Sequence, residues 1–231
     1  MKMRRVLLIT IFLSLSIRTF AQVDEGKPGA WYMYFWNTSF GDSKFGMQGD
    51  IQHRNWNVVG DLEQLLIRGG FTYNQAKSKI KYTLGYGNIT SGQFGDSNTT
   101  SKEHRIYQEA LLPLNLDKKV FIVNRLRYEQ RFVENQDFRT RYRYNLFINI
   151  PLNSIVMGKG SIYLAFYNEL FINGERDIGN NRKVKIFDRN RTYGALGFGL
   201  AEAMKLQVGY MHQATSGVKK RQVQLSLHHQ F

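Results

Sequence analysis

Apolar and polar residues alternate along most of the chain with a period of two. The alternation is strictest over residues 138–150, where Arg139, Arg141 and Arg143 share one series of positions and Tyr142 and Tyr144 belong to the other. A period of two places alternate side chains on opposite faces of a β-strand. Beyond residue 22 the sequence shows no pattern with the 3.6-residue period of an amphipathic helix. The pattern therefore predicts an all-β fold.

Eleven alternating segments follow one another and are separated by turn residues. The expected strands span residues 30–39, 44–54, 63–74, 79–89, 103–114, 119–132, 138–150, 161–172, 188–200, 204–214 and 221–231. Short connections, such as 41–43 and 201–203, alternate with longer polar ones, such as 90–102 and 174–185. This arrangement is typical of a transmembrane antiparallel up-and-down β-barrel. Single-chain bacterial barrels have even strand numbers, so we predict about twelve strands, with ten as the alternative. A twelfth strand would lie within residues 22–30, and ten would mean that one strand has been split.

The N-terminal residues have the features of a secretory signal peptide. Lys2, Arg4 and Arg5 precede an apolar run over residues 6–17, and small residues occupy positions 19 and 21. The apolar run is too short to cross a bilayer as a helix. We therefore predict a cleaved signal peptide at 1–21 and a barrel at 22–231, located in the cell outer membrane. The chain has no cysteine, which excludes disulfides and thiolate metal sites.

The net charge of +14 restricts the expected partners. A basic protein can bind nucleic acid, but export argues against that partner. Outer-membrane lipid, anionic lipopolysaccharide and small anions fit an exported basic barrel better. The mean hydropathy of −0.40 does not argue against a membrane protein, because half of each barrel strand faces a polar lumen.

The last eleven residues, RQVQLSLHHQF, end in phenylalanine and place Val223, Leu225 and Leu227 on one face. This segment, with Phe231 at its end, resembles the C-terminal signal by which the barrel-assembly machinery recognises outer-membrane barrels. His229 stands where an aromatic residue is usual. The barrel-assembly machinery is thus an expected partner.

Several segments also resemble a Bacteroidota family of outer-membrane barrels that is catalogued as a domain of unknown function. The resemblance covers essentially the whole predicted mature chain, and the most specific segments are NRLRYEQRF at 124–132 and YNELFIN at 167–173. The resemblance implies a barrel in the outer membrane of a Gram-negative bacterium. It implies no activity.

Arginines are concentrated in the strands at 119–132 and 138–150. An arginine facing lipid would cost about 2–4 kcal/mol at the bilayer midplane, so these side chains are expected to face the lumen. Hairpin pairing places Glu129 opposite Arg141 or Arg143. The same arithmetic brings Glu109 near Arg125, Arg105 near Glu129, and Glu169 near Arg141 or Arg143. The predicted lumen charge belt consists of Arg68, Arg105, Glu109, Arg125, Arg127, Glu129, Arg131, Arg139, Arg141, Arg143, Glu169, Arg189 and Arg191.

The lumen charge belt has two interpretations. Its ion pairs can brace and fill a narrow barrel. Alternatively, the arginines in excess of the acids, at positions 68, 131, 139, 189 and 191, can line a path for anions. The predicted function is accordingly a non-enzymatic membrane component, either structural or a small-solute channel that prefers anions. The alternatives are a membrane-embedded hydrolase and a subunit of a larger envelope complex.

Other residues carry little catalytic or metal-binding signal. His228 and His229 are adjacent and point to opposite faces of a strand, so they cannot chelate one ion together, and neither a metal site nor a cofactor is expected. Glu103, His104 and Asp96 form the one candidate cluster for hydrolysis, although such residues at a rim are usually solvated loop residues. Gly197 and Gly199 are expected to relieve crowding inside the wall.

Overall fold

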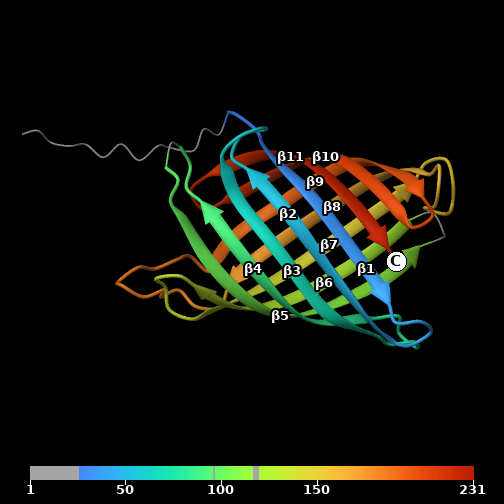
Figure 1. Cartoon of the computed structure of the whole chain (residues 1–231), viewed down its shortest axis with the longest axis horizontal. Helices are drawn as coiled ribbons and strands as arrows, with labels where there is room; N and C mark the ends of the chain where they lie inside the picture. The colour runs from blue at the N-terminus through green and yellow to red at the C-terminus, as the bar shows by residue number, and fades with distance from the viewer. Residues whose placement is uncertain (1–25, 96, 117–119) are drawn as a thin grey trace, which may run out of the picture.

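The computed structural model describes residues 26–95, 97–116 and 120–231, which form a closed barrel of eleven strands (Figure 1). The predicted signal peptide and Asp96 lie outside the described residues. The strands are β1 Gly29–Ser39, β2 Phe45–Asn55, β3 Leu62–Asn74, β4 Lys81–Gly92, β5 Thr100–Leu116, β6 Val120–Val133, β7 Arg139–Pro151, β8 Ile162–Asn173, β9 Phe187–Ala201, β10 Met204–Thr215 and β11 Lys219–Gln230. In the described part of the chain, no helix is long and apolar enough to cross a membrane.

Each strand corresponds to one of the eleven alternating segments of the sequence. The largest differences are at β4, expected at 79–89 and found at Lys81–Gly92, and at β5, which extends the expected segment 103–114 to Thr100–Leu116. The connections contain residues that tolerate the left-handed backbone region. Gly41 has φ of +55° in the turn after β1, and Asn135 has φ of +57° in the turn after β6.

The strand number corrects the expectation of twelve or ten strands. Consecutive strands pair antiparallel, and the ring closes where β1 pairs with β11 in parallel. With eleven up-and-down strands the first and last run in the same direction, so their contact must be parallel. Residues 26–28 precede β1 without forming a strand, and residues 22–25 lie outside the described residues. The described barrel therefore departs from the rule that single-chain bacterial barrels have even strand numbers.

The two ends of the barrel differ in their connections. The short-turn end carries residues 40–44, 75–80, 152–161 and 202–203, together with the C-terminus (Figure 1). The long-loop end carries the connections 93–99 and 174–186. In the β8–β9 loop, the carbonyl of Ile178 accepts a hydrogen bond from the backbone of Asp137 at 3.0 Å, so this loop is held against the β6–β7 turn.

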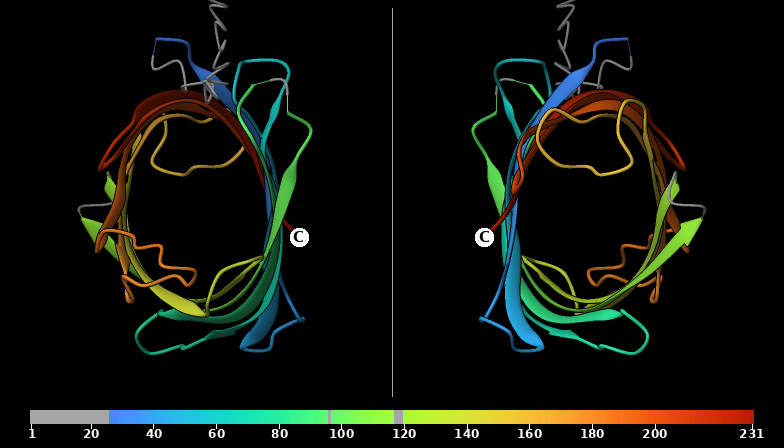
Figure 2. Two further views of the ribbon diagram at one scale, coloured as in Figure 1. Left: turned by 90° about the vertical axis from the view of Figure 1, so that its left-hand side faces the viewer. Right: turned by 90° about the vertical axis from the view of Figure 1, so that its right-hand side faces the viewer.

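Apolar residues face outward and polar residues face the lumen, which reverses the distribution of a water-soluble barrel. Viewed along the barrel, the strands form a closed ring (Figure 2). On its outer face Phe71 is 66% exposed and Leu84 is 59% exposed. On its inner face Gln222 and Gln224 are buried. The alternation of the sequence thus sorts apolar side chains to the outside.

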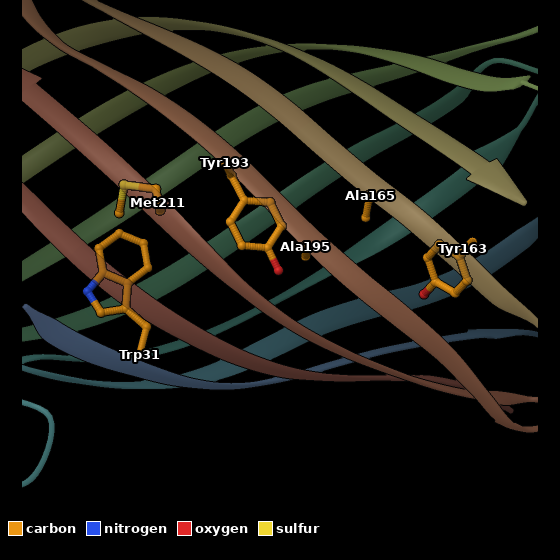
Figure 3. Close-up of a cluster of buried hydrophobic side chains, with 6 residues drawn as sticks. All are labelled: Trp31, Tyr163, Ala165, Tyr193, Ala195 and Met211. Atoms are coloured by element: carbon orange, nitrogen blue, oxygen red, sulfur yellow. The ribbon is translucent and has the colours of Figure 1, made fainter. Parts of the chain in front are cut away.

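A smaller cluster of apolar residues lies inside the ring. It consists of Trp31, Tyr163, Ala165, Tyr193, Ala195 and Met211 (Figure 3). Trp31 and Met211 lie beside each other, and Tyr163 lies further toward the short-turn end (Figure 3). The aromatic residues fill part of the lumen on the side of β8–β11 and β1.

Candidate functional site: the lumen charge belt

The residues of the lumen charge belt come mainly from β5 to β9 and point into the barrel. Eleven of the thirteen are buried, and Arg125 and Arg189 are half-buried. Their position follows from the two-residue period, because the intervening residues such as Leu126 and Tyr142 are 52% and 54% exposed on the outer face. The strands therefore gather the charges of residues 68–191 in one compartment.

Glu129 is the centre of the belt. It is 1% exposed and lies opposite Arg141 in the register of β6 and β7. Arg141 donates to Oε2 through Nη2 at 2.6 Å, and Arg143 donates to Oε1 through Nη1 at 2.6 Å. The guanidinium groups of Arg127 and Arg105 lie 3.9 and 4.0 Å from Oε1. One carboxylate is thus shared by four arginines.

Glu109 and Glu169 hold the neighbouring arginines. Arg127 donates to Oε2 of Glu109 at 2.5 Å, and the amide of Gln48 on β2 donates to Oε1 at 3.0 Å. Arg125 and Arg143 both donate to Oε1 of Glu169, the former at 2.5 Å. Arg125 also lies 3.7 Å from Glu109. The register places Glu109 opposite Arg127, one pair away from the expected partner.

Three acids that the sequence analysis left out of the belt neutralise arginines that it counted as surplus. Glu103 accepts hydrogen bonds from Arg131 at 2.6 Å and from Arg105 at 2.5 Å. Asp50 binds Arg68 at 2.9 Å on another part of the wall. The arginine surplus of the lumen is accordingly smaller than the sequence indicated.

Asp188 is the third of these acids, and a β-bulge places it in the lumen. The register of β8 and β9 shifts between Phe171 and Ile172, so that Asp188 has no partner on β8. The bulge lets two consecutive residues point the same way. Asp188 accepts from Arg141 at 3.0 Å and from Arg189 at 3.2 Å. A strict two-residue alternation would have put Asp188 on the outer face.

Arg139 and Arg191 are the least compensated arginines of the belt. Arg139 is buried opposite Arg131 and forms no ion pair with any other described residue. Arg191 lies 3.7 Å from Glu169, and its Nε donates to Gln213 at 2.8 Å. Local positive charge therefore remains at these two positions.

Aromatic rings connect the belt to the opposite wall. The guanidinium of Arg54 lies 3.7 Å from the ring centroid of Trp31, and that of Arg191 lies 4.7 Å from the same ring. Arg191 also lies 4.7 Å from the ring of Phe171 on β8. Stacking of arginine on aromatic rings is favourable and excludes water. A layer of charged and aromatic groups from β1, β2, β8 and β9 thus crosses the lumen. The predicted belt did not include its Trp31 and Arg54.

A cavity of about 470 Å³ lies between this layer and the short-turn end. Its lining reaches from Arg54 and Arg191 of the layer to Lys81 and Lys205, which lie at the short-turn ends of β4 and β10. Met157 of the β7–β8 connection also lines it. The connection folds inward over the barrel opening (Figure 2).

A family model described as a protein of unknown function (DUF2490) matches residues 28–224, which include almost the whole barrel. The chain belongs to this family. The Bacteroidota origin stays a prediction. Neither the curated proteins nor the solved structures contain a match to the chain.

The structure separates Glu103 from His104, two residues of the candidate hydrolytic cluster. Glu103 faces the lumen, where its carboxylate is used by two arginines, while His104 is exposed on the outer face beside Tyr86, with 2.5 Å between the hydroxyl and Nδ1. The described residues contain no group of three or more acidic or histidine side chains arranged to hold a metal ion. A Cβ atom at Gly197 would collide with the ring of Tyr163, so this glycine relieves crowding inside the wall as expected.

The C-terminal strand places the residues of the predicted assembly signal on the outside. Leu225 is 39% exposed, and Val223 and Leu227 are half-buried on the same face. The hydroxyl of Tyr34 lies 3.0 Å from Nδ1 of His229, and the rings of His229 and Phe231 are 4.0 Å apart. The histidine thus packs as an aromatic residue would at this position.

Proposed function

We propose that the protein is a non-enzymatic outer-membrane β-barrel whose lumen is closed to free diffusion by the lumen charge belt. The outward band of apolar side chains supports the membrane location, because exposed residues such as Phe71 and Leu84 would otherwise contact water. We place the short-turn end on the periplasmic side, as is usual for outer-membrane barrels.

The burial of Glu129 is the observation that carries the closed state. A carboxylate that is 1% exposed and shared by four arginines lies in a packed layer, not beside a water-filled pore. The acid partners of Arg68 and Arg131 support the same state, because they remove cations from the predicted anion path. We therefore favour a structural barrel, braced by its lumen charge belt, over a general small-solute channel.

Conductance in planar bilayers tests the closed state. We expect the wild-type barrel to insert without stable channel openings. A double variant, Arg127→Ser with Arg191→Ser, removes two long side chains from the lumen charge belt and is expected to conduct ions. Arg221→Ser, on the exposed outer face of β11, is the matched control and should stay silent. Insertion is checked separately by the different migration of heated and unheated samples on a denaturing gel.

Stable wild-type channels with a preference for anions would contradict the closed state and support the channel instead. Hydrolysis of vesicle phospholipid by purified protein would contradict the non-enzymatic part of the proposal. The separation of Glu103 from His104 argues against such turnover, because a general base must lie within hydrogen-bond distance of the group that it activates. Stable co-purification of another envelope protein would place the barrel in a larger complex.

A further inference from the structure

The cavity at the short-turn end combines positive charge with an apolar wall. Its lining contains eight arginine or lysine side chains and three carboxylates, so the cavity as a whole favours anions. The three carboxylates, Asp50, Glu109 and Glu169, are each bound by at least one arginine. A small cationic ligand would therefore meet repulsion and no free acid.

Two lysines lie at the edge of the cavity. Neither Lys81 nor Lys205 forms an ion pair within the described residues, and both are half-buried. Arg125 lies near Lys81, because both residues pair with Leu111 of β5 from opposite sides. Across two strand spacings their backbones are about 10 Å apart, so both side chains can reach one anionic group.

The wall beside Lys81 and Arg125 is apolar. Leu111, Val123 and Phe147 line the cavity there, and the guanidinium of Arg125 lies 5.2 Å from the ring centroid of Phe147. Met33 and Phe35 of β1 also line the cavity, and Phe35 stacks on His228 with 4.9 Å between the ring centroids. Apolar walls with a few polar groups are typical of small-molecule sites of about 300–1,000 Å³.

We propose that this cavity binds a single-chain amphiphilic anion, such as an aliphatic carboxylate. The head group interacts with Lys81 and Arg125, and the chain lies along Leu111, Val123 and Phe147. The site rests on the proposed closed lumen, because the layer of Trp31, Arg54 and Arg191 forms its floor. An anion without an apolar chain would leave the apolar wall in contact with water. An uncharged chain would leave Lys81 without a counterion.

Binding of dodecanoate to the barrel in nanodiscs of zwitterionic lipid tests the inference, with the heat of partition into empty nanodiscs subtracted. We expect one site per barrel. Dodecanol, which has the same chain without the charge, should bind at least about tenfold more weakly, since a hydrogen bond to a charged group contributes about 1.5–3 kcal/mol. Acetate should not compete, because it lacks the chain.

Variants distinguish the site from general attraction by a basic protein. Lys81→Gln should weaken dodecanoate binding about tenfold. Lys77→Gln, an exposed residue of the neighbouring turn, removes the same charge and should leave binding unchanged. Val123→Trp should abolish binding by filling the apolar wall, while unheated and heated samples still migrate differently. A lysophospholipid with a zwitterionic head group tests whether the site instead takes membrane lipid. It should bind more weakly than dodecanoate.

Equal binding of dodecanoate and dodecanol, or equal effects of the two lysine variants, would overturn the inference. A wild-type barrel that conducts ions but shows the expected binding would contradict the closed lumen and leave the site in place. A wild-type barrel that does not conduct ions and binds no dodecanoate would support the closed lumen and overturn the binding site. The two proposals therefore fail separately.

Discussion

Arg141 on β7 donates two hydrogen bonds to one oxygen of Glu129, its register partner on β6, through Nε at 2.9 Å and Nη2 at 2.6 Å. The other oxygen is bound by Arg143, so two arginines on the same face of one strand hold the two oxygens of a single carboxylate. The pair is therefore a joint between β6 and β7 as well as the centre of the belt.

Glu129→Gln is expected to destabilise the folded barrel strongly. The substitution keeps the shape of the side chain but leaves four nearby arginines with less negative charge, and breaking a buried pair typically costs about 3–5 kcal/mol. Equilibrium unfolding by urea in lipid vesicles measures the loss. Asp42→Asn, in an exposed turn, removes the same charge and should leave the midpoint unchanged. A loss of about 1 kcal/mol or less, together with anion-selective conductance, would indicate a wet lumen instead.

Leu126→Arg tests which face of β6 meets lipid. Leu126 is 52% exposed between the inward-facing Arg125 and Arg127, so the new charge would enter hydrocarbon. We expect a loss of folding free energy of up to about 4 kcal/mol in vesicles, depending on depth in the bilayer. Leu126→Met is the apolar control. Unchanged stability of both variants would reverse the inside and outside of this strand, and the lumen charge belt would have to be reassigned.

The sequence predicts the strands and their faces well because both follow from local alternation. It also predicts the contacts of neighbouring strands, such as Glu129 with Arg141, to within one pair, because a short turn limits the register. All eleven segments were visible, and only the general rule of even strand numbers led to a different count.

Contacts across the lumen could not be predicted in the same way. The stacking of Arg191 on Trp31 joins β9 to β1, and it depends on how the ring closes and how the strands tilt. The lumenal position of Asp188 depends on a bulge, which adds one residue to a strand and has no signature in the alternation. These two features account for Asp188 and for the aromatic rings missing from the predicted belt. Asp50 and Glu103 lie in regular register, so their absence from the predicted belt has neither cause.

Deletion of Phe231 tests the predicted assembly signal separately from stability. Phe231 is 67% exposed, and its backbone nitrogen donates to the carbonyl of Asn37 at 2.9 Å, so few folded contacts depend on its side chain. We expect less barrel in the outer-membrane fraction of expressing cells, with nearly unchanged unfolding of the refolded protein in vesicles. Gln230→Ala is the control for both measurements. Normal membrane levels after the deletion would show that the terminal phenylalanine is not part of the signal.

Gly197→Ala tests the packing of the aromatic residues at the short-turn end. Gly197 is the register partner of Tyr163, and a Cβ atom there would lie 2.2 Å from the ring. The tyrosine would have to move, and overpacking of this kind typically costs about 1–3 kcal/mol. Gly69→Ala is the matched control, because Gly69 also lies within a strand and a Cβ atom would meet no other atom within 4 Å. Urea midpoints in vesicles compare the two variants. If Tyr163 is what Gly197 accommodates, the further change Tyr163→Leu should restore part of the loss in the Gly197→Ala background; equal midpoints for the two glycine variants would show that the ring is free to move.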